Sequence, residues 1–205
     1  GAARAESGCD GVLVPTQVNK YLQREQELAL SYLIDSQSEY DDVVNAGASG
    51  DYGLFRTDAN YESMKNKRDK LVEERKLNIN PVEAQKIVAT FVDEDKAANW
   101  FKCKIAELGG VILWLSDMST NQVTVNLEWS PLRGVPVAYR GPIDIRGAEQ
   151  TKADIEERIQ QEWPSRGGTA FILDRKVNEE LRLVVVIGGK TDSVFLPSPP
   201  PVPEP

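Results

Sequence analysis

The sequence contains no histidine among its 205 residues. Histidine is the base of Ser-His-Asp and Cys-His catalysis and a common ligand of zinc, so these sites and any histidine-based pH switch are excluded. Cysteine is almost as scarce, and two cysteines cannot supply an all-cysteine zinc site or a four-thiolate iron–sulfur cluster. We therefore expect no catalytic residue, no metal and no cofactor.

Long hydrophobic runs and an excess of positive charge are also missing. No apolar run approaches the ~20 residues that span a bilayer, so no transmembrane segment is expected. The chain has 24 Lys and Arg against 32 Asp and Glu, a net charge of −8. General nucleic-acid binding is therefore not expected, because it normally requires a basic surface. The 40% hydrophobic and 27% charged residues are typical of a globular protein of one or two domains.

The first residues favour export. Residues 3–5 (Ala-Arg-Ala) have the small-x-small form of a signal-peptidase site. Cys9 and Cys103 can form one disulfide in an oxidising compartment. A buried unpaired Cys103 and a lipid-anchored Cys9 are the alternatives, although residues 6–8 lack the aliphatic residue expected before an anchored cysteine. We expect an exported protein of the periplasm, an organelle lumen or the extracellular space, with a peripheral membrane location allowed.

The N-terminal half is predicted to be helical. Residues 1–14 form an irregular lead-in, and residues 15–79 form a helical hairpin whose second, very polar helix is capped by Asp58. A helix this polar either lies exposed on its own protein or belongs to an arm that docks on another protein. Pro81 then starts a third helix, which we assign to the next domain.

The clearest structural signal lies between Trp100 and Trp129. Residues 122–129 alternate polar and apolar side chains, which predicts a strand with one buried face. Residues 111–115 are apolar on both faces, as in a strand buried on both sides, and a hairpin loop joins the two strands.

A further strand is predicted over residues 101–108, where Phe101, Cys103 and Ile105 alternate with lysines. The glycines at 109 and 110 then introduce either a bulge in one long bent strand or an ordinary hairpin turn between two strands. Both alternatives stay open.

The remaining elements are predicted from shorter patterns. Residues 137–146 form a strand with Tyr139 on its core face, and Pro142 makes it an edge strand or a bulged one. Residues 151–163 form a helix with a capping box of Thr151 and Asp154. Residues 169–177 and 180–188 form a hairpin. The proline-rich residues 191–205 form an extended tail, which is a linker or a docking peptide.

The predicted fold class is therefore α+β. A helical hairpin or arm precedes a small OB-like Greek-key β-barrel over residues 80–190, with one helix between strands 3 and 4. A generic α+β sheet, with separate strands at 101–108 and 111–117, is the competing architecture.

One segment resembles a known family. Residues 81–112 resemble the start of the small tRNA-anticodon-binding-like OB domains of exported bacterial proteins. The matching residues are Glu94, Ala97, Ala98, Trp100, Lys102, Lys104, Ile105, Leu108, Gly110 and Val111. The resemblance implies an OB barrel in an exported protein, and it implies no activity.

Four residues are the candidate interaction residues, because interfaces favour Trp and Arg: Trp114, Arg133, Arg140 and Arg146. The first hypothesis is a non-catalytic accessory or assembly subunit, which binds other proteins of an envelope or lumenal complex that is associated with a membrane. A second is an OB-type module that binds an oligosaccharide or a single-stranded nucleic acid, with Trp114 exposed for stacking.

A third, weaker hypothesis is an enzyme that uses carboxylates alone. It requires a close pair of acids with different proton affinities, for which Asp117 with Glu128, or Asp144 with Glu149, are the candidates.

Overall fold

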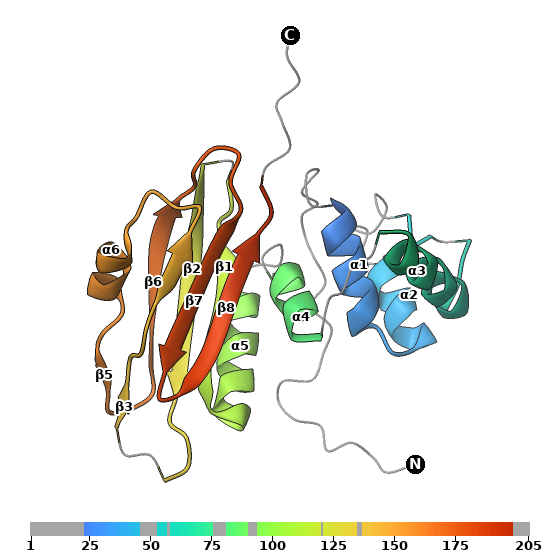
Figure 1. The fold of residues 1–205 in the computed structure, drawn as a ribbon. Helices are drawn as coiled ribbons and strands as arrows, with labels where there is room; N and C mark the ends of the chain where they lie inside the picture. The colour runs from blue at the N-terminus through green and yellow to red at the C-terminus, as the bar shows by residue number, and fades with distance from the viewer. Residues whose placement is uncertain are drawn as a thin grey trace. The chain divides into compact units, whose positions relative to one another are not determined.

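The computed structural model describes residues 23–45, 53–56, 58–75, 81–89, 94–119, 121–134 and 137–198. The chain divides into two compact units, residues 1–97 and residues 98–205, and each is described by itself (Figure 1). The described residues are mixed α+β, with six helices and eight strands in open sheets. No described helix is long and apolar enough to cross a membrane.

The described part of the first unit contains four helices around one core. They are α1 (Gln23–Leu33), α2 (Gln37–Asn45), α3 (Tyr61–Arg75) and α4 (Pro81–Ala89). The predicted first helix is therefore two helices, because the Ser36 hydroxyl accepts a hydrogen bond from the Glu39 N–H and starts α2 anew. Helix α4 starts at Pro81 as predicted, but Ala84 and Val88 belong to this helical core rather than to the β domain.

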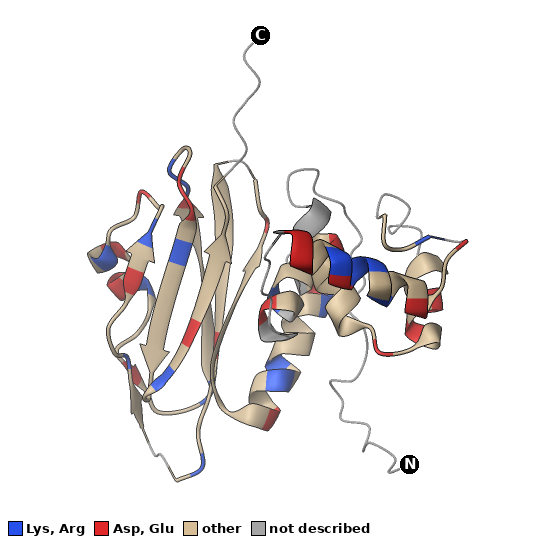
Figure 2. Cartoon of the chain, turned by 45° about the vertical axis from the view of Figure 1, so that its right-hand side comes forward, with Lys and Arg blue, Asp and Glu red and all other residues tan. Residues whose placement is uncertain are grey.

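The polar helix α3 lies on the other helices of its own unit. Met64 is fully buried in the core, and Arg68 donates to the Ser31 carbonyl of α1 and lies over the Tyr32 ring at 5.0 Å. Most of its other positions carry charges, and both signs are present, as Figure 2 shows along the helix. The two-helix hairpin predicted for this region is thus part of a compact helical unit.

The second unit contains α5 (Glu94–Leu108) from residue 98 onward and three sheets. Sheet A has the order β1-β2-β6, sheet B pairs β3 with β5, and sheet C has the order β4-β7-β8. The strands are β1 (Gly110–Ser116), β2 (Gln122–Ser130), β3 (Ala138–Tyr139), β4 (Asp144–Arg146), β5 (Glu162–Trp163), β6 (Gly167–Asp174), β7 (Leu181–Ile187) and β8 (Lys190–Leu196). The predicted β1–β2 hairpin and its inward and outward faces are confirmed.

The predicted strand over residues 101–108 is wrong, because these residues belong to α5 (Glu94–Leu108). Ala97, Phe101 and Ile105 recur every four residues and are all buried, so a helical stripe fits the segment better than alternation does. Gly109, at φ +69°, donates its N–H to the Ile105 carbonyl and ends the helix. The glycines are therefore a helix cap, neither a bulge nor a hairpin turn.

The core of the second unit lies between the inner faces of sheets A and C. Val125, Leu127 and Trp129 of β2 face it from one side, and Leu183 and Val185 of β7 face it from the other; all are at most 1% exposed. Helix α6 (Lys152–Arg158) covers one opening of this core. Its predicted capping box of Thr151 and Asp154 is confirmed, although the helix ends at Arg158 and not at residue 163; Ile155, Ile159 and Trp163 are all buried.

The predicted hairpin of residues 169–177 and 180–188 is wrong in its pairing. Strands form there, but β6 pairs with β2, whereas β7 pairs with β4 and β8. The chain leaves sheet A at Lys176, whose N–H binds the Gly147 carbonyl, and crosses to sheet C. Strand β8 was not predicted. It takes residues 190–196, six of which were assigned to the tail, and it follows the two positive-φ glycines Gly188 and Gly189.

The strand predicted over residues 137–146 is broken into β3 and β4. Arg140 lies opposite Ile187, and Asp144 lies opposite Val184. Between these two pairs the chain advances by four residues on this strand but by only three on β7. The extra residue is a bulge beside Pro142, on an edge strand, as predicted. Tyr139 is exposed and Ala138 is buried, the reverse of the predicted faces.

The expected closed barrel is not found, since all three sheets are open in the described residues. β1 and β8 run side by side. The N–H of Leu113 on β1 donates to the Asp192 carboxylate of β8 at 2.6 Å, so a side chain caps this edge where a barrel would have a backbone ladder.

Candidate interaction surface

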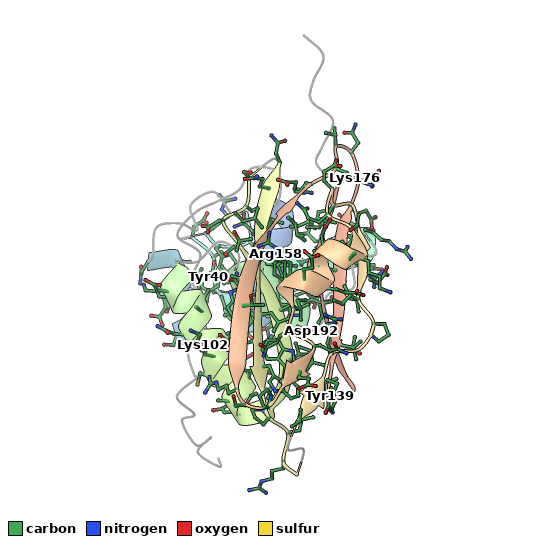
Figure 3. The ribbon with its side chains drawn as sticks, turned by 90° about the vertical axis from the view of Figure 1, so that its left-hand side faces the viewer. Tyr40, Lys102, Tyr139, Arg158, Lys176 and Asp192 are labelled. Carbon is green, nitrogen blue, oxygen red and sulfur yellow. The ribbon has the colours of Figure 1, made fainter. Side chains whose placement is uncertain are left out.

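The outer face of sheet C carries exposed aromatic and arginine side chains. We define it by six outward residues of sheet C and by Tyr139 of β3, whose carbonyl accepts from the Gly188 N–H at the end of β7. The six residues are Asp144, Arg146, Arg182, Val184, Val186 and Phe195. Tyr139 and Phe195 are 58% and 51% exposed. Figure 1 looks onto this face, with β7 and β8 nearest the viewer, and Figure 3 labels Tyr139.

Two arginines lie directly opposite each other on this face. Arg146 of β4 faces Arg182 of β7, and Arg182 faces Phe195 of β8, so the three residues form one row across the sheet. Like charges in this position destabilise a sheet by a few tenths to about 1 kcal/mol. Arg146 approaches the Asp144 carboxylate at 3.7 Å, and Arg182 has no ion-pair partner in the described part of the chain.

Half-buried valines adjoin this row. Val184 and Val186 point outward from β7, and Gly141 lies beside Val186, where a Cβ would meet its Cγ1 at 3.0 Å. An apolar patch next to arginine and aromatic side chains is the composition that protein interfaces favour.

Of the predicted interaction residues, only Arg146 lies on this face. Arg140 instead donates to the carbonyls of Glu156 and Ile159, both at 2.8 Å, and so holds the end of α6. Arg133 is exposed in the turn after β2, and no described residue makes a hydrogen bond or ion pair with it. Cys9 lies outside the described residues and Cys103 lies on α5, so their pairing stays a prediction.

Trp114 was expected to be exposed, and this is wrong. Its side chain is 3% exposed, and its ring stacks on Phe101 of α5 at 4.7 Å. Helix α5 covers this part of the outer face of sheet A, which a strand at 101–108 would not have done. The stacking role that the oligosaccharide or nucleic-acid hypothesis gave to Trp114 therefore has no exposed ring to support it.

The outer face of sheet A also holds a carboxylate with a raised pKa. Glu128 is largely buried, which raises its pKa, while Lys102 at 3.9 Å and Arg166 partly oppose the shift. Gly168 makes room for it, because a Cβ there would lie 2.6 Å from the Glu128 Oε1. A group of this kind is a candidate acid or base only if a second reacting group is near.

The candidate carboxylate pairs are not supported. Glu128 lies opposite Ile112 at one end of the β1–β2 hairpin, and Asp117 follows Ser116 at the other end. Asp144 is directed toward Arg146. Within the described residues, no three His, Cys, Asp or Glu side chains are placed to hold a metal ion. The outer face of sheet C is therefore the candidate functional site.

Sequence reasoning missed Arg182 and Phe195 because it missed β8. The signal was present in Gly188 and Gly189, since two adjacent glycines between apolar alternations predict a tight hairpin. Arg182 and Phe195 lie equally far from that turn, so a hairpin register would have placed them opposite each other.

No family model, no curated protein and no solved structure matches this chain.

Proposed function

We propose that this chain is a non-catalytic accessory protein of an exported, membrane-associated complex, and that it binds another protein through the outer face of sheet C. The observation that carries the proposal is the row of Arg146, Arg182 and Phe195. Export is supported by the signal-peptidase-like residues 3–5 and by the two cysteines.

The row supports binding because the fold gains little from it. The two facing arginines repel each other, and Phe195 leaves half of its surface in water. A partner with an acidic group beside an apolar patch would neutralise the arginines and bury the phenylalanine. Arginine and aromatic residues with these properties supply much of the binding energy at protein interfaces.

The proposal is tested by charge reversal at single positions. The tagged full chain is expressed in its native compartment, and captured proteins are quantified for the wild type, Arg146→Glu, Arg182→Glu and Arg133→Glu. Arg133 is the matched control, because it is also an exposed arginine and its reversal changes the net charge equally. We expect a protein that the wild type and Arg133→Glu capture, and that the other two variants lose.

Two results would contradict the proposal. One is the capture of the same proteins in equal amounts by all four chains. The other is the absence of any captured protein above the level of an untagged control. Circular dichroism of each variant separates loss of binding from loss of folding.

A further inference from the structure

Strand β6 forms an open edge of sheet A. It pairs with β2 over Gly167 to Asp174, and no described strand of sheet A lies on its other side. In an antiparallel strand, the N–H and C=O of one residue point to the same neighbour, and successive residues point to opposite neighbours. The direction of each residue of β6 therefore follows from two of its hydrogen bonds.

Those two bonds fix the outward residues. The Arg175 N–H donates to the Asn121 carbonyl, which is on the β2 side, whereas the Asp174 carbonyl accepts from the Glu149 N–H on the opposite side. The even-numbered residues thus point away from β2. Asp174 is satisfied there, because its own N–H donates to the Gln150 Oε1 at 2.9 Å.

The remaining outward backbone groups belong to Gly168, Ala170 and Ile172. In the part of the chain that the structure describes, these residues make no hydrogen bond on the outward side. Edge strands are normally protected by a lysine, a proline, a bulge or an inward charge. Residues 167–173 (Gly-Gly-Thr-Ala-Phe-Ile-Leu) contain none of these residue types, and Ile172 is 57% exposed.

The other edge of the same sheet is protected. The Leu113 N–H of β1 is bound by the Asp192 carboxylate of β8. An inward charged side chain that meets an edge is one of the usual devices against strand pairing. Residues 167–173 of β6 lack such a device, so this edge is available to another strand.

The edge of β6 is complementary to itself. If two copies pair antiparallel about Ala170, then Gly168 of each copy faces Ile172 of the second copy, a residue without a side chain beside a bulky one. Arg166 and Asp174 lie beyond this register and keep partners in their own chain, because Arg166 donates to the Lys102 carbonyl and the outward side of Asp174 is bound by Glu149 and Gln150.

The unpaired segment of β6 and the register described for two copies are both centred on the same residue. Residues 167–173 are bounded by Arg166 on one side and by the segment of Glu149 and Gln150, which binds Asp174, on the other. Their midpoint is Ala170. The Glu128 carboxylate fills the space directly over Gly168, so the facing Ile172 would lie beside this carboxylate and not above the glycine.

We propose that this chain forms a two-fold dimer by antiparallel pairing of the β6 edges about Ala170, which joins two copies of sheet A into one continuous sheet. Each of the facing pairs 168–172, 170–170 and 172–168 exchanges two backbone hydrogen bonds. The symmetry is closed, because each copy uses the open residues of its β6 edge on the other, so the contact does not propagate into fibres.

The first test is the molar mass of the full chain in solution, measured by sedimentation over a range of concentrations. We expect a reversible monomer–dimer equilibrium. Ala170→Pro removes an outward N–H and leaves the ladder to β2 intact, and Ile172→Glu places a second carboxylate beside Glu128 of the facing copy; either should raise the dimer Kd by about tenfold or more. If the proline variant fails to fold, the glutamate variant at the exposed position 172 still decides.

The register is tested by crosslinking single cysteines. In the proposed dimer the two Ala170 Cα atoms lie about 5.5 Å apart, within the range that a disulfide bridges. The two Ile172 Cα atoms would be separated by four residues, roughly 13 Å. We expect Ala170→Cys to crosslink to a second copy under mild oxidation, and Ile172→Cys on the same face to crosslink no more than the wild type.

Four results would overturn the proposal. They are a monomer at every concentration, a dimer that neither edge variant weakens, assemblies larger than a dimer, and equal crosslinking at positions 170 and 172. These results are independent of the outer face of sheet C, because Arg146→Glu and Arg182→Glu leave the β6 edge unchanged. The proposed function and the dimer can therefore fail separately.

Discussion

The outer faces of sheets A and C have similar outward side chains, but one face is covered by a helix and the other is exposed. Each carries an outward aromatic residue, Trp114 on β1 and Phe195 on β8. Trp114 is 3% exposed because α5 covers it and Phe101 stacks on its ring, whereas Phe195 remains 51% exposed. The alternation in a strand therefore shows which side chains point away from the core. Whether these side chains are exposed to solvent depends on which other elements cover that face.

The polar groups of the two faces differ in the same way. On sheet A, Asn126 donates to the Ser116 hydroxyl at 2.9 Å, and Glu128 lies 3.9 Å from Lys102, so polar groups have partners. On sheet C, Arg146 and Arg182 face each other. The first arrangement is what a covered face needs for stability. The two facing arginines on sheet C are tolerated because that face is exposed to solvent, and they would attract an acidic partner.

The largest expected difference is between the two aromatic residues. Trp114→Ala removes a buried ring from the contact of α5 with sheet A, and it should lower the free energy of unfolding by about 3–5 kcal/mol. Phe195→Ala should change it by at most ~0.5 kcal/mol, as exposed positions usually do. Urea unfolding of the two variants checks this. Similar losses for both would mean that the face of sheet C is covered in solution.

A smaller difference is expected between polar residues of the two faces. Asn126→Ala leaves the Ser116 hydroxyl without its donor and should cost about 1 kcal/mol in the free energy of unfolding. Thr191→Ala, at an exposed outward position of β8, is the matched control and should cost almost nothing. The same urea titrations measure both, and an equal cost would remove the distinction between the faces.

Glu128 should make the stability depend on pH in a characteristic direction. Its pKa in the folded chain is raised above the ordinary value of 4.5, so the ionised form costs stability, and that cost appears as the pH rises through the folded pKa. Glu128→Gln should therefore have a higher Tm than the wild type at pH 7, and the difference should vanish below pH 4.5. Thermal unfolding at several pH values measures it.

Asp154 provides a control of opposite sign for that measurement. Hydrogen bonds from Thr151 lower its pKa, so its contribution is present at neutral pH and is lost as the pH falls through the folded pKa. Asp154→Asn should lower the Tm at pH 7 and converge on the wild type in acid. A Glu128→Gln curve that resembles the Asp154→Asn curve would show that Glu128 is stabilised by its cations rather than destabilised by burial.

The smallest expected effect is a gain in stability on the open face. Arg182→Glu replaces the facing like charges by an arginine, Arg146, opposite a carboxylate. It should raise the free energy of unfolding by a few tenths of a kcal/mol, up to about 1. The gain should shrink in high salt, because exposed charges are screened. Unfolding at low and high ionic strength checks this, and a loss of stability would show that Arg182 has a structural role.

The sequence was sufficient where one local pattern had one interpretation. Alternation from Gln122 to Trp129 predicted the faces of β2, and Thr151 with Asp154 predicted the start of α6. The sequence was insufficient where the same residues fitted both the alternation of a strand and the spacing of a helix. Phe101 and Ile105 satisfy both alternation and a helical spacing, and Ala97, one turn earlier, is the residue that favours the helix.

Strand pairing and exposure depend on parts of the chain that are far apart in the sequence. β6 and β7 are adjacent in the sequence but belong to different sheets, because the chain crosses from one sheet to the other between them. Trp114 is buried by a helix that was predicted as a strand. That one error therefore also made Trp114 a wrong candidate for the interaction surface. Arg146 was identified, but Arg182 and Phe195 required the register of the β7–β8 hairpin.

The most direct test of the proposed binding surface is photo-crosslinking in the native compartment. A photo-reactive amino acid is placed at Phe195, on the outer face of sheet C, or at Leu108, an apolar position at the end of α5 that is more exposed still, 76% against 51%. We predict a discrete adduct with another protein at position 195 that is absent at position 108 and is lost when Arg182→Glu is added. Adducts at both positions, or at neither, would contradict the account.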